Sequence, residues 1–200
     1  MAETLGSEFK SSGVTEKTPG NIPFGAGTIH KGLKFDSGTK KWNFAESLVG
    51  ATSGGSKFEI APEVTQVEVD GAWVAVAELD VKTGETANME INFVELTPDI
   101  IKASVIGQSA NSDIEGYSVI TSKPNIEKGD YWDNIAFVGK TLTGRPIIVI
   151  MDNALCTSGL SIEGKNKEAG VGKYTFRCSQ KIGGDLTTLP YKIYYPTPSA

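Results

Sequence analysis

The chain has 200 residues, a formal net charge of −5 and an apolar share of 39%, to which 23 glycines add. This length suits one substantial domain, and this composition argues against a chain that is disordered throughout. The acidic balance argues against a general nucleic-acid binder, and the apolar run at residues 147–151 is too short to cross a bilayer.

The N-terminal region has few of the apolar residues that would offset the entropy of ordering it. Residues 1–21 are polar and glycine-rich, and we expect a flexible arm there. The pattern that follows predicts a first strand over residues 28–35. Its candidate core residues are Ile29, Leu33 and Phe35.

A long connection with aromatic residues comes next, over residues 36–55. It contains Trp42, Phe44 and Leu48. A connection of that length is uncommon in a compact domain unless it binds something. Two interpretations stay open, an ordinary surface loop and a docking segment.

The alternation of apolar and polar residues predicts three consecutive strands between residues 57 and 95. Asp70-Gly71 is a strong signal for a two-residue hairpin turn, and the strand that returns covers residues 73–82. A second turn is expected at residues 82–85. The apolar positions predicted to face the core are Val67, Val69, Leu79, Val81, Met89, Ile91 and Phe93. The other face is expected to be wet and mostly acidic.

A helix is predicted over residues 98–106. Thr97 can cap it, Pro98 suits its first position, and Asp99 favours the positive end of the helix dipole. Ile100, Ile101 and Val105 are expected to pack on the sheet. Gly107 is expected to end the helix.

The C-terminal half predicts a second sheet. Its expected strands, in chain order, cover residues 117–122, 135–141 and 146–151, then Leu160 and Ile162, and last the alternating Tyr174, Phe176 and Cys178. The apolar run at 147–151 predicts a strand buried on both faces. Residues 191–200 carry two prolines and are expected to be extended.

Together these elements predict a mainly β fold. We expect two antiparallel sheets packed as a β-sandwich, one short flanking α-helix, and an extended arm at each end. The corresponding division is an N-terminal arm at 1–21, a sandwich domain at 22–190 and a C-terminal tail at 191–200.

The two cysteines leave a choice open. Cys156 and Cys178 could pair across the sandwich, but the N-terminus lacks the basic and apolar segments of a secretory signal. This favours two buried thiols in a reducing compartment.

No motif supports catalysis, a cofactor or a metal. Gly139-Lys140-Thr141 would be part of a phosphate loop only if a glycine stood at Asn134 and a helix followed. His30 is the only histidine and stands where a dinucleotide motif starting at Gly25 needs its third glycine. A dyad of His30 with a cysteine is not excluded by sequence distance. The acidic residues that could be imagined as paired catalytic carboxylates are read as solvated strand surface: Glu68, Glu78, Asp80 and Glu90. We therefore expect a protein that is not an enzyme.

Five segments, in this order, resemble one family over nearly the whole chain. They are IPFGAGTIHKG (22–32), LVGATSGGSKFEIAPEVTQVEVDGA (48–72), MEINFVELTPDIIKAS (89–104), AFVGKTLTGRPIIVIMDNAL (136–155) and PYKIYYP (190–196). This succession resembles the tail tube, or major tail, proteins of long-tailed, siphovirus-type bacteriophages.

The resemblance implies a tail-tube β-sandwich that forms hexameric rings, with strands joined into a β-barrel around a channel. Such rings stack into a tube for genome ejection. The implied partners are copies of the chain, other tail proteins such as the tape measure, terminator and distal tail proteins, and DNA that passes without specific binding. The implied location is the virion tail, assembled in the host bacterial cytoplasm, with no membrane.

Within that interpretation, the wet face of the 65–95 sheet supplies candidates for the channel lining. They are Glu68, Asp80, Glu90 and Asn92. Candidates for contact with the next ring are Trp42, Phe44 and Leu48. The alternative is a monomeric carbohydrate-binding or adhesin-like module of a virion, with Trp42, Trp73 or Trp132 as stacking platforms for sugars. Particle size distinguishes the two.

Overall fold

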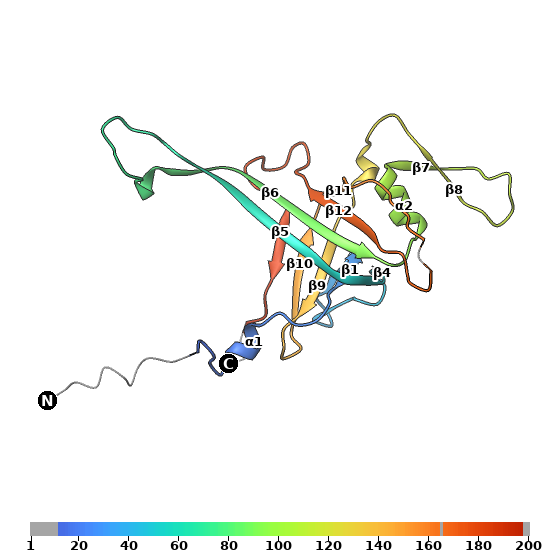
Figure 1. Cartoon of the computed structure of the whole chain (residues 1–200), viewed down its shortest axis with the longest axis horizontal. Helices are drawn as coiled ribbons and strands as arrows, with labels where there is room; N and C mark the ends of the chain where they lie inside the picture. Colours follow the sequence, from blue (N-terminus) through green and yellow to red (C-terminus); the bar gives the residue numbers. More distant parts are fainter. Residues whose placement is uncertain (1–11, 165, 198–200) are drawn as a thin grey trace.

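The computed structural model describes residues 12–164 and 166–197 (Figure 1). The fold is mainly β, as predicted, with two larger antiparallel sheets. The five-stranded sheet has the order β13-β10-β9-β1-β4, which are Tyr191–Tyr194, Pro146–Met151, Ile135–Lys140, Thr28–Lys31 and Leu48–Gly50. The four-stranded sheet has the order β11-β12-β6-β5, which are Ala154–Cys156, Gly172–Cys178, Asp80–Phe93 and Thr52–Gln66.

Two small hairpins and four short helical segments complete the described residues. The hairpins are β2 (Phe35–Asp36) with β3 (Lys41–Trp42), and β7 (Gly107–Ala110) with β8 (Val119–Ser122). The helical segments are α1 (Thr18–Asn21), α2 (Pro98–Val105) and the 3-10 turns Ala77–Leu79 and Lys128–Asp130. The short helix α1 lies in the predicted N-terminal arm. Residues 1–11 and 198–200 of the two predicted arms lie outside the described residues.

The main core lies between the two larger sheets. The five-stranded sheet contributes Ile29, Ile135 and Met151, each fully buried. Residues of the four-stranded sheet that face them alternate along β6 and β12, and they are Ala87, Met89, Ile91, Phe93, Tyr174, Phe176 and Cys178. The predicted core alternation is therefore confirmed over residues 87–93 and 174–178, where a facing sheet covers one side of the strands.

A second, smaller core covers the outer face of the five-stranded sheet. There the buried residues Leu33, Ala136, Ile148 and Ile150 lie under Trp42, Phe44 and Val138. This explains why the strand at 146–151 is buried on both faces, as predicted. The predicted long connection at 36–55 is wrong, because the segment contains the β2–β3 hairpin, β4 and the start of β5. Phe35, predicted to be core, is 51% exposed.

The helix α2, Pro98–Val105, confirms the predicted start and extent but not the residue predicted to end it. The Thr97 hydroxyl accepts a hydrogen bond from the Ile100 backbone N–H at 3.3 Å, as a cap does. At the other end, Ile106 takes the left-handed conformation (φ 50°), not Gly107. Gly107 instead begins β7, where a Cβ would lie 2.9 Å from the Thr121 carbonyl oxygen. Close packing against β8 requires this glycine, and the helix cap does not.

The strands predicted across residues 67–79 and the turn predicted at 82–85 are wrong. β5 continues to Gln66 and β6 begins at Asp80, so residues 67–79 form a long loop. Asp70-Gly71 does turn the chain, with Ala72 N–H bonded to the Val69 carbonyl at 3.1 Å, but inside that loop. The turn predicted at 82–85 lies within β6. The alternation there has no facing sheet, so it carries no information about which residues are buried.

Three further differences concern the C-terminal half. The strand predicted at 117–122 is shorter, and no strand forms at Leu160 and Ile162, where Ile162 is 69% exposed. The tail at 191–200 is extended as predicted over β13, but it is not a free arm. β13 pairs with β10, from Ile148 opposite Tyr194 to Met151 opposite Tyr191.

Candidate assembly surfaces

The distal part of the β5–β6 hairpin projects from the body as an arm (Figure 1). We call residues 61–86 the arm and residues 64–81 the arm tip. The loop of the tip surrounds a hollow of about 470 Å³ and does not pack on itself. Its exposed apolar residues, with exposed fractions, are Val64 60%, Val67 51%, Val69 53%, Trp73 96%, Val74 78%, Val76 36% and Val81 48%.

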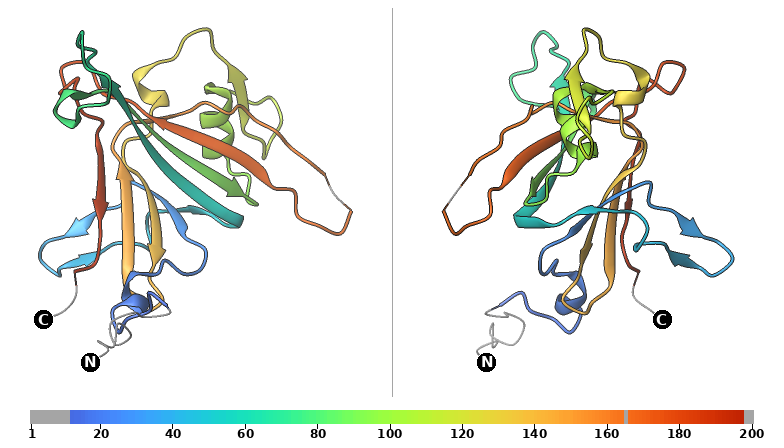
Figure 2. Two further views of the ribbon diagram at one scale, coloured as in Figure 1. Left: turned by 60° about the vertical axis from the view of Figure 1, so that its left-hand side comes forward. Right: turned by 90° about the vertical axis from the view of Figure 1, so that its right-hand side faces the viewer.

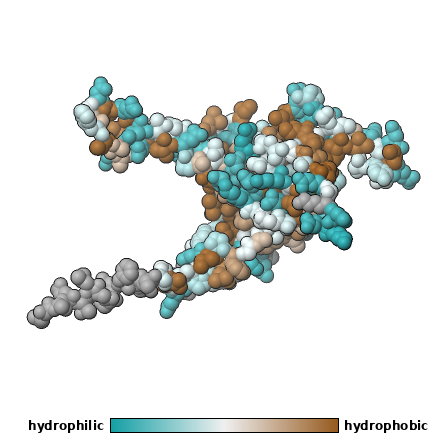
Figure 3. All heavy atoms as spheres, viewed as in Figure 1, coloured by the Kyte–Doolittle hydropathy of each residue, from teal (hydrophilic) through white to brown (hydrophobic). Residues whose placement is uncertain are grey.

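The arm tip is acidic as well as apolar. Residues 58–81 contain six carboxylates and no Lys, Arg or His. The carboxylates are Glu59, Glu63, Glu68, Asp70, Glu78 and Asp80. Figure 3 shows hydrophobic and hydrophilic atoms side by side at this end of the molecule. An exposed apolar patch of this kind marks an interaction surface.

A bulge at Thr83 reverses the faces of β6 along the arm. Glu63 lies opposite Gly84 and Val64 lies opposite Lys82, so Thr83 is the extra residue. Val81 is therefore not on the core face with Met89 and Ile91, although the sequence spacing puts it there. The prediction that Val81 is buried is wrong because the bulge moves this residue off the core face. The prediction that Val69 is buried is wrong because no sheet faces the arm tip.

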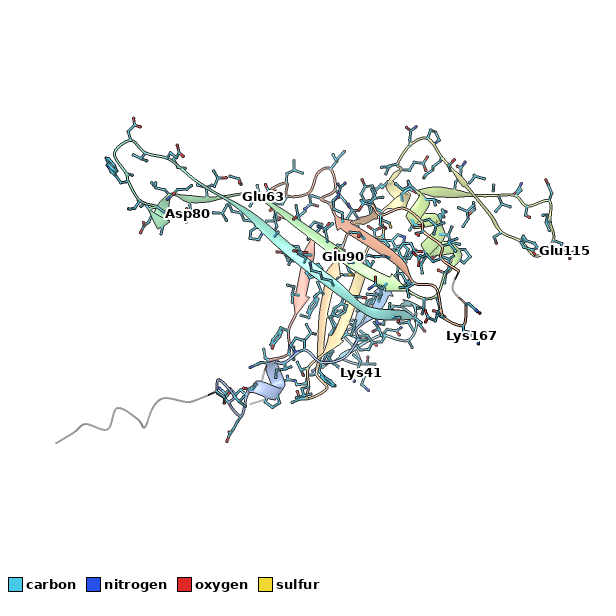
Figure 4. The ribbon with its side chains drawn as sticks, viewed as in Figure 1. Lys41, Glu63, Asp80, Glu90, Glu115 and Lys167 are labelled. Carbon is cyan, nitrogen blue, oxygen red and sulfur yellow. The ribbon has the colours of Figure 1, made fainter. Side chains whose placement is uncertain are left out.

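The bulge also separates the residues predicted to line a channel. Glu90 and Asn92 lie on the outward face of the four-stranded sheet, where Lys173 Nζ is 3.5 Å from Glu90 Oε2. Asp80 lies beyond the bulge on the opposite face, about 33 Å further along the strand, and Glu68 lies in the tip loop. Figure 4 shows Asp80 on the arm and Glu90 on the body. The structure thus brings together only Glu90 and Asn92.

The outward face around Glu90 carries mixed charge, so the prediction of a mostly acidic face is wrong. Its charged residues between β5 and β12 are Lys57, Glu59, Glu90, Lys173 and Arg177. Lys57 pairs with Glu59, and Lys173 with Glu90. The carboxylates of this face lie on β6 and β5, and β5 and β12 also supply cations that the pattern of β6 alone does not reveal.

One side of β5 has no pairing partner among the described strands, since β5 pairs only with β6. The Glu63 carbonyl accepts a bond from the Thr83 hydroxyl at 3.4 Å, and Val67 N–H donates to the Leu79 carbonyl at 2.9 Å. Odd-numbered residues of β5 therefore direct their backbone groups to β6, and even-numbered ones such as Ile60 direct theirs to the open side. Pro62 has no N–H to offer there, which limits the open edge to the part of β5 before it.

A buried carboxylate attaches the base of the arm to the body. The Tyr191 hydroxyl on β13 donates to Glu85 on β6, and Lys82 pairs with the same carboxylate. The bond from Lys82 and then the bond from Tyr191 lower the pKa of Glu85. Phe58 packs beside the Tyr191 ring at 6.3 Å between centroids. The arm is thus anchored where it leaves the sandwich.

The aromatic residues predicted to contact the next ring lie mostly on the chain's own sheet. Trp42 is half-buried between Phe35 and Tyr194, with ring centroids 5.3 and 5.0 Å away. Phe44 packs edge-on to His30 at 5.7 Å. Leu48 is 55% exposed on the edge strand β4. Of the three residues, Leu48 has its side chain most available to a partner.

The tryptophans do not form a shared platform for a sugar. Trp132 is 5% exposed, and Lys31 Nζ lies 4.4 Å from its ring centroid. Trp42 is enclosed by rings, and Trp73 is exposed alone at the arm tip. From the sequence, Trp73 is named only as a possible platform for a sugar and not as a contact between copies.

The histidine and the cysteines lie in separate packed environments. His30 bonds to hydroxyls, Nδ1 to Ser47 Oγ and Nε2 to Thr28 Oγ1, both at 2.9 Å. Burial lowers the pKa of His30, against a smaller opposite effect of the Phe44 backbone. Cys156 and Cys178 are buried and free, and they lie opposite Phe176 and Ala154 respectively, not opposite each other. In residues 12–164 and 166–197, no group of three or more His, Cys, Asp or Glu side chains could hold a metal ion.

Two general findings complete the description. Over the described ranges, no helix combines the length and hydropathy needed to cross a membrane. No protein-family model and no curated protein sequence matches this chain.

Proposed function

We propose that this chain is a structural subunit of a phage tail tube. In this proposal, copies join into hexameric rings, the rings stack, and the four-stranded sheets form a β-barrel of tail-tube type around a channel for DNA ejection. The observation that carries it is the open edge of β5 in a chain that also projects an exposed apolar arm. Both features are hazards for an isolated molecule and are removed by pairing with other copies.

The open edge supports lateral joining of copies. Ile60 and Phe58 direct backbone groups to the unpaired side of β5, so a strand of a neighbouring copy can complete the ladder. Closing a ring leaves no edge exposed, whereas a monomer keeps one. The edge is interrupted at Pro62, which keeps the acidic arm out of the barrel.

The mixed charge of the outward face supports passage of DNA without retention. If this face lines the channel, Glu90 and Asn92 are among the lining residues, and both lysines beside Glu90 are paired with carboxylates, which leaves Arg177 as the one cation of this described face without an ion pair. A channel wall with few unpaired cations makes few contacts with DNA phosphates, so it has little salt-dependent affinity for DNA. Glu68 and Asp80 lie off this face, and we place them in contacts between copies.

The proposal extends to partners and location. It makes the chain a virion protein without enzymatic activity or cofactor, assembled in the host cytoplasm. Its neighbours are its own copies and the tape measure, terminator and distal tail proteins. The mainly β fold is compatible with these partners and this location, and the resemblance of the five segments is the basis for proposing them.

Negative-stain electron microscopy and sedimentation velocity of concentrated protein test the proposal directly. We expect rings of six copies, and tubes as concentration rises. A protein that stays monomeric at every accessible concentration contradicts it.

Ile60→Pro gives a sharper test of the edge. Proline removes the N–H on the open side of β5 but leaves the ladder to β6 intact, since residue 60 does not direct that group to β6. Ile60→Val is the matched control, because both variants lose part of a half-buried side chain. We expect both to fold by circular dichroism, and only the valine variant to form rings.

A further inference from the structure

We propose that the arm tip docks on the opposite end of a second copy of this chain, at a basic and apolar surface around Phe24 and Leu142. We call this the basal surface. It consists of Ile22, Phe24, Leu142, Lys17, Lys140 and Arg145. The inference rests on the proposed function, because it assigns the contact between successive rings.

Two segments distant in sequence build the basal surface. Pro23 bridges to Thr141, Phe24 N–H donates to the Lys140 carbonyl at 2.8 Å, and Leu142 N–H donates to the Ile22 carbonyl at 2.9 Å. The apolar side chains that this arrangement brings together remain exposed. Their exposed fractions are Ile22 42%, Phe24 58% and Leu142 49%.

The charge of the basal surface is opposite to that of the arm tip. The segments that build it, residues 14–27 and 137–146, contain three cations, Lys17, Lys140 and Arg145, and one carboxylate, Glu16. Lys17 and Lys140 are exposed beside the apolar residues. The arm tip, residues 64–81, has four carboxylates and no cation. Opposite charge around apolar centres on both sides favours this pairing and disfavours tip-to-tip or base-to-base contacts.

The two surfaces lie at opposite ends of the molecule. In both views of Figure 2 the arm tip is at the top, and α1 with the β9–β10 turn is at the bottom. The contact therefore joins different copies. Because the two patches differ, the contact is heterologous and does not close in pairs, so it can repeat from ring to ring along a stack.

Trp73 reports the contact in solution. Its side chain is 96% exposed, whereas Trp132 is 5% exposed and Trp42 is half-buried. We expect tube formation to shift Trp emission to shorter wavelength and to reduce quenching by iodide. Trp73→Phe should remove this change, and Trp73→Ala should raise the protein concentration needed for tubes by about tenfold or more, as losing an aromatic anchor at an interface does.

Charge exchange between the two surfaces is the decisive test. One variant carries Glu68→Lys with Glu78→Lys at the arm tip, and the other carries Lys17→Glu with Lys140→Glu at the base. We expect each alone to form rings without tubes. An equal mixture of preformed rings of the two variants should restore tubes in which the two kinds of ring alternate, and all four changes in one chain should also restore tubes, because each contact then joins opposite charges.

The outcomes separate the inference from the proposed function. Rings without tubes in each variant, and tubes in the mixture, support the inference. Tubes that form in both single-surface variants at the wild-type concentration overturn it and leave the ring proposal standing. Wild-type protein that forms neither rings nor tubes overturns both.

Discussion

His30 is surrounded by groups that suit its neutral form. Ser47 Oγ donates to the Asn43 carbonyl at 2.9 Å and is therefore free to accept from Nδ1–H, while Thr28 can donate to Nε2. The side chain is 2% exposed, and burial lowers its pKa below the usual 6.5. The unfolded chain consequently binds a proton at a pH where the folded chain does not. The contribution of His30 to stability is present above pH 6.5 and is lost as pH falls toward the folded pKa.

Replacing His30 with Gln tests this at the residue scale. We expect the wild-type free energy of unfolding to decrease between about pH 7 and about pH 5, and the variant to show a smaller decrease. At about pH 7 the variant should lose about 1–3 kcal/mol, because a buried hydroxyl loses its partner. Urea denaturation at the two pH values measures both. Equal pH slopes in the two proteins would show that another group controls the effect.

Burial makes the Cys178 thiol unreactive. Burial, and then the charge of Asp152, raise its pKa to about 11, so the thiolate is scarce near neutral pH. We expect neither cysteine to react with Ellman's reagent in the folded protein, and both to react in urea. Rapid reaction of one thiol in the native state would contradict the packing of the β11–β12 pair.

At the scale of elements, the arm does not contribute to the core. The two clusters of buried residues include no residue of 61–86. Joining Thr65 to Val81 through Asn-Gly, in place of residues 66–80, keeps their register and places the two-residue turn after a hydrogen-bonded pair, as such a hairpin requires. We expect the free energy of unfolding to change by less than about 1 kcal/mol and tubes to be lost. A large loss of stability in urea denaturation would show that the loop supports the sandwich.

In contrast to the arm, the short terminal strand β13 is needed for the stability of the fold. A chain ending at Pro190 lacks β13, its ladder with β10, and Tyr191, which packs against the main core. We expect such a chain to lose at least about 3 kcal/mol or to fail to fold, because buried strand groups lose their partners. A chain ending at Pro196 keeps β13 and is the matched control. Similar melting temperatures for the two would contradict this role of the strand.

At the scale of the whole molecule, the net charge of −5 hides a strong separation of charge. The acidic arm and the basic basal surface lie at opposite ends (Figure 2). Contacts between exposed opposite charges weaken with salt, because the screening length falls from about 30 Å at 0.01 M to about 3 Å at 1 M. Backbone hydrogen bonds along β5 are less sensitive. We expect added salt to dissociate tubes into rings before it dissociates rings, as followed by electron microscopy, and rings that dissociate first would reverse the assignment of the two surfaces.

Sequence patterns predicted the fold well wherever two sheets face each other. Alternation along Met89, Ile91 and Phe93 and along Tyr174 and Phe176 reports burial, because each strand there has one wet and one covered face. The cap at Thr97 located the helix through local backbone chemistry. The same alternation failed at Val81, where one bulge residue inverts the faces, and at Trp73, where no sheet covers the strand.

The candidate surfaces were predicted less well than the fold. Trp42 and Phe44 suggested docking because an ordinary surface loop would leave such large apolar side chains exposed. In the structure they cover the outer face of the chain's own five-stranded sheet. The lining residues follow from the alternation within single predicted strands, so the cations of β5 and β12 beside Glu90 were missed. The sequence does contain one indication of the arm, because residues 58–81 include no Lys, Arg or His.

By itself, the amino-acid sequence determined the β character of the chain, the buried strands at 146–151 and 174–178, and the capped helix, since these depend on local periodicity and capping. Only the tertiary structure decided which face of each strand is covered, that β5 keeps an open edge, and that acidic and basic apolar surfaces stand at opposite ends. Those properties depend on register, on a single bulge and on contacts between segments more than a hundred residues apart, such as Phe24 with Lys140. No pattern within one segment encodes them.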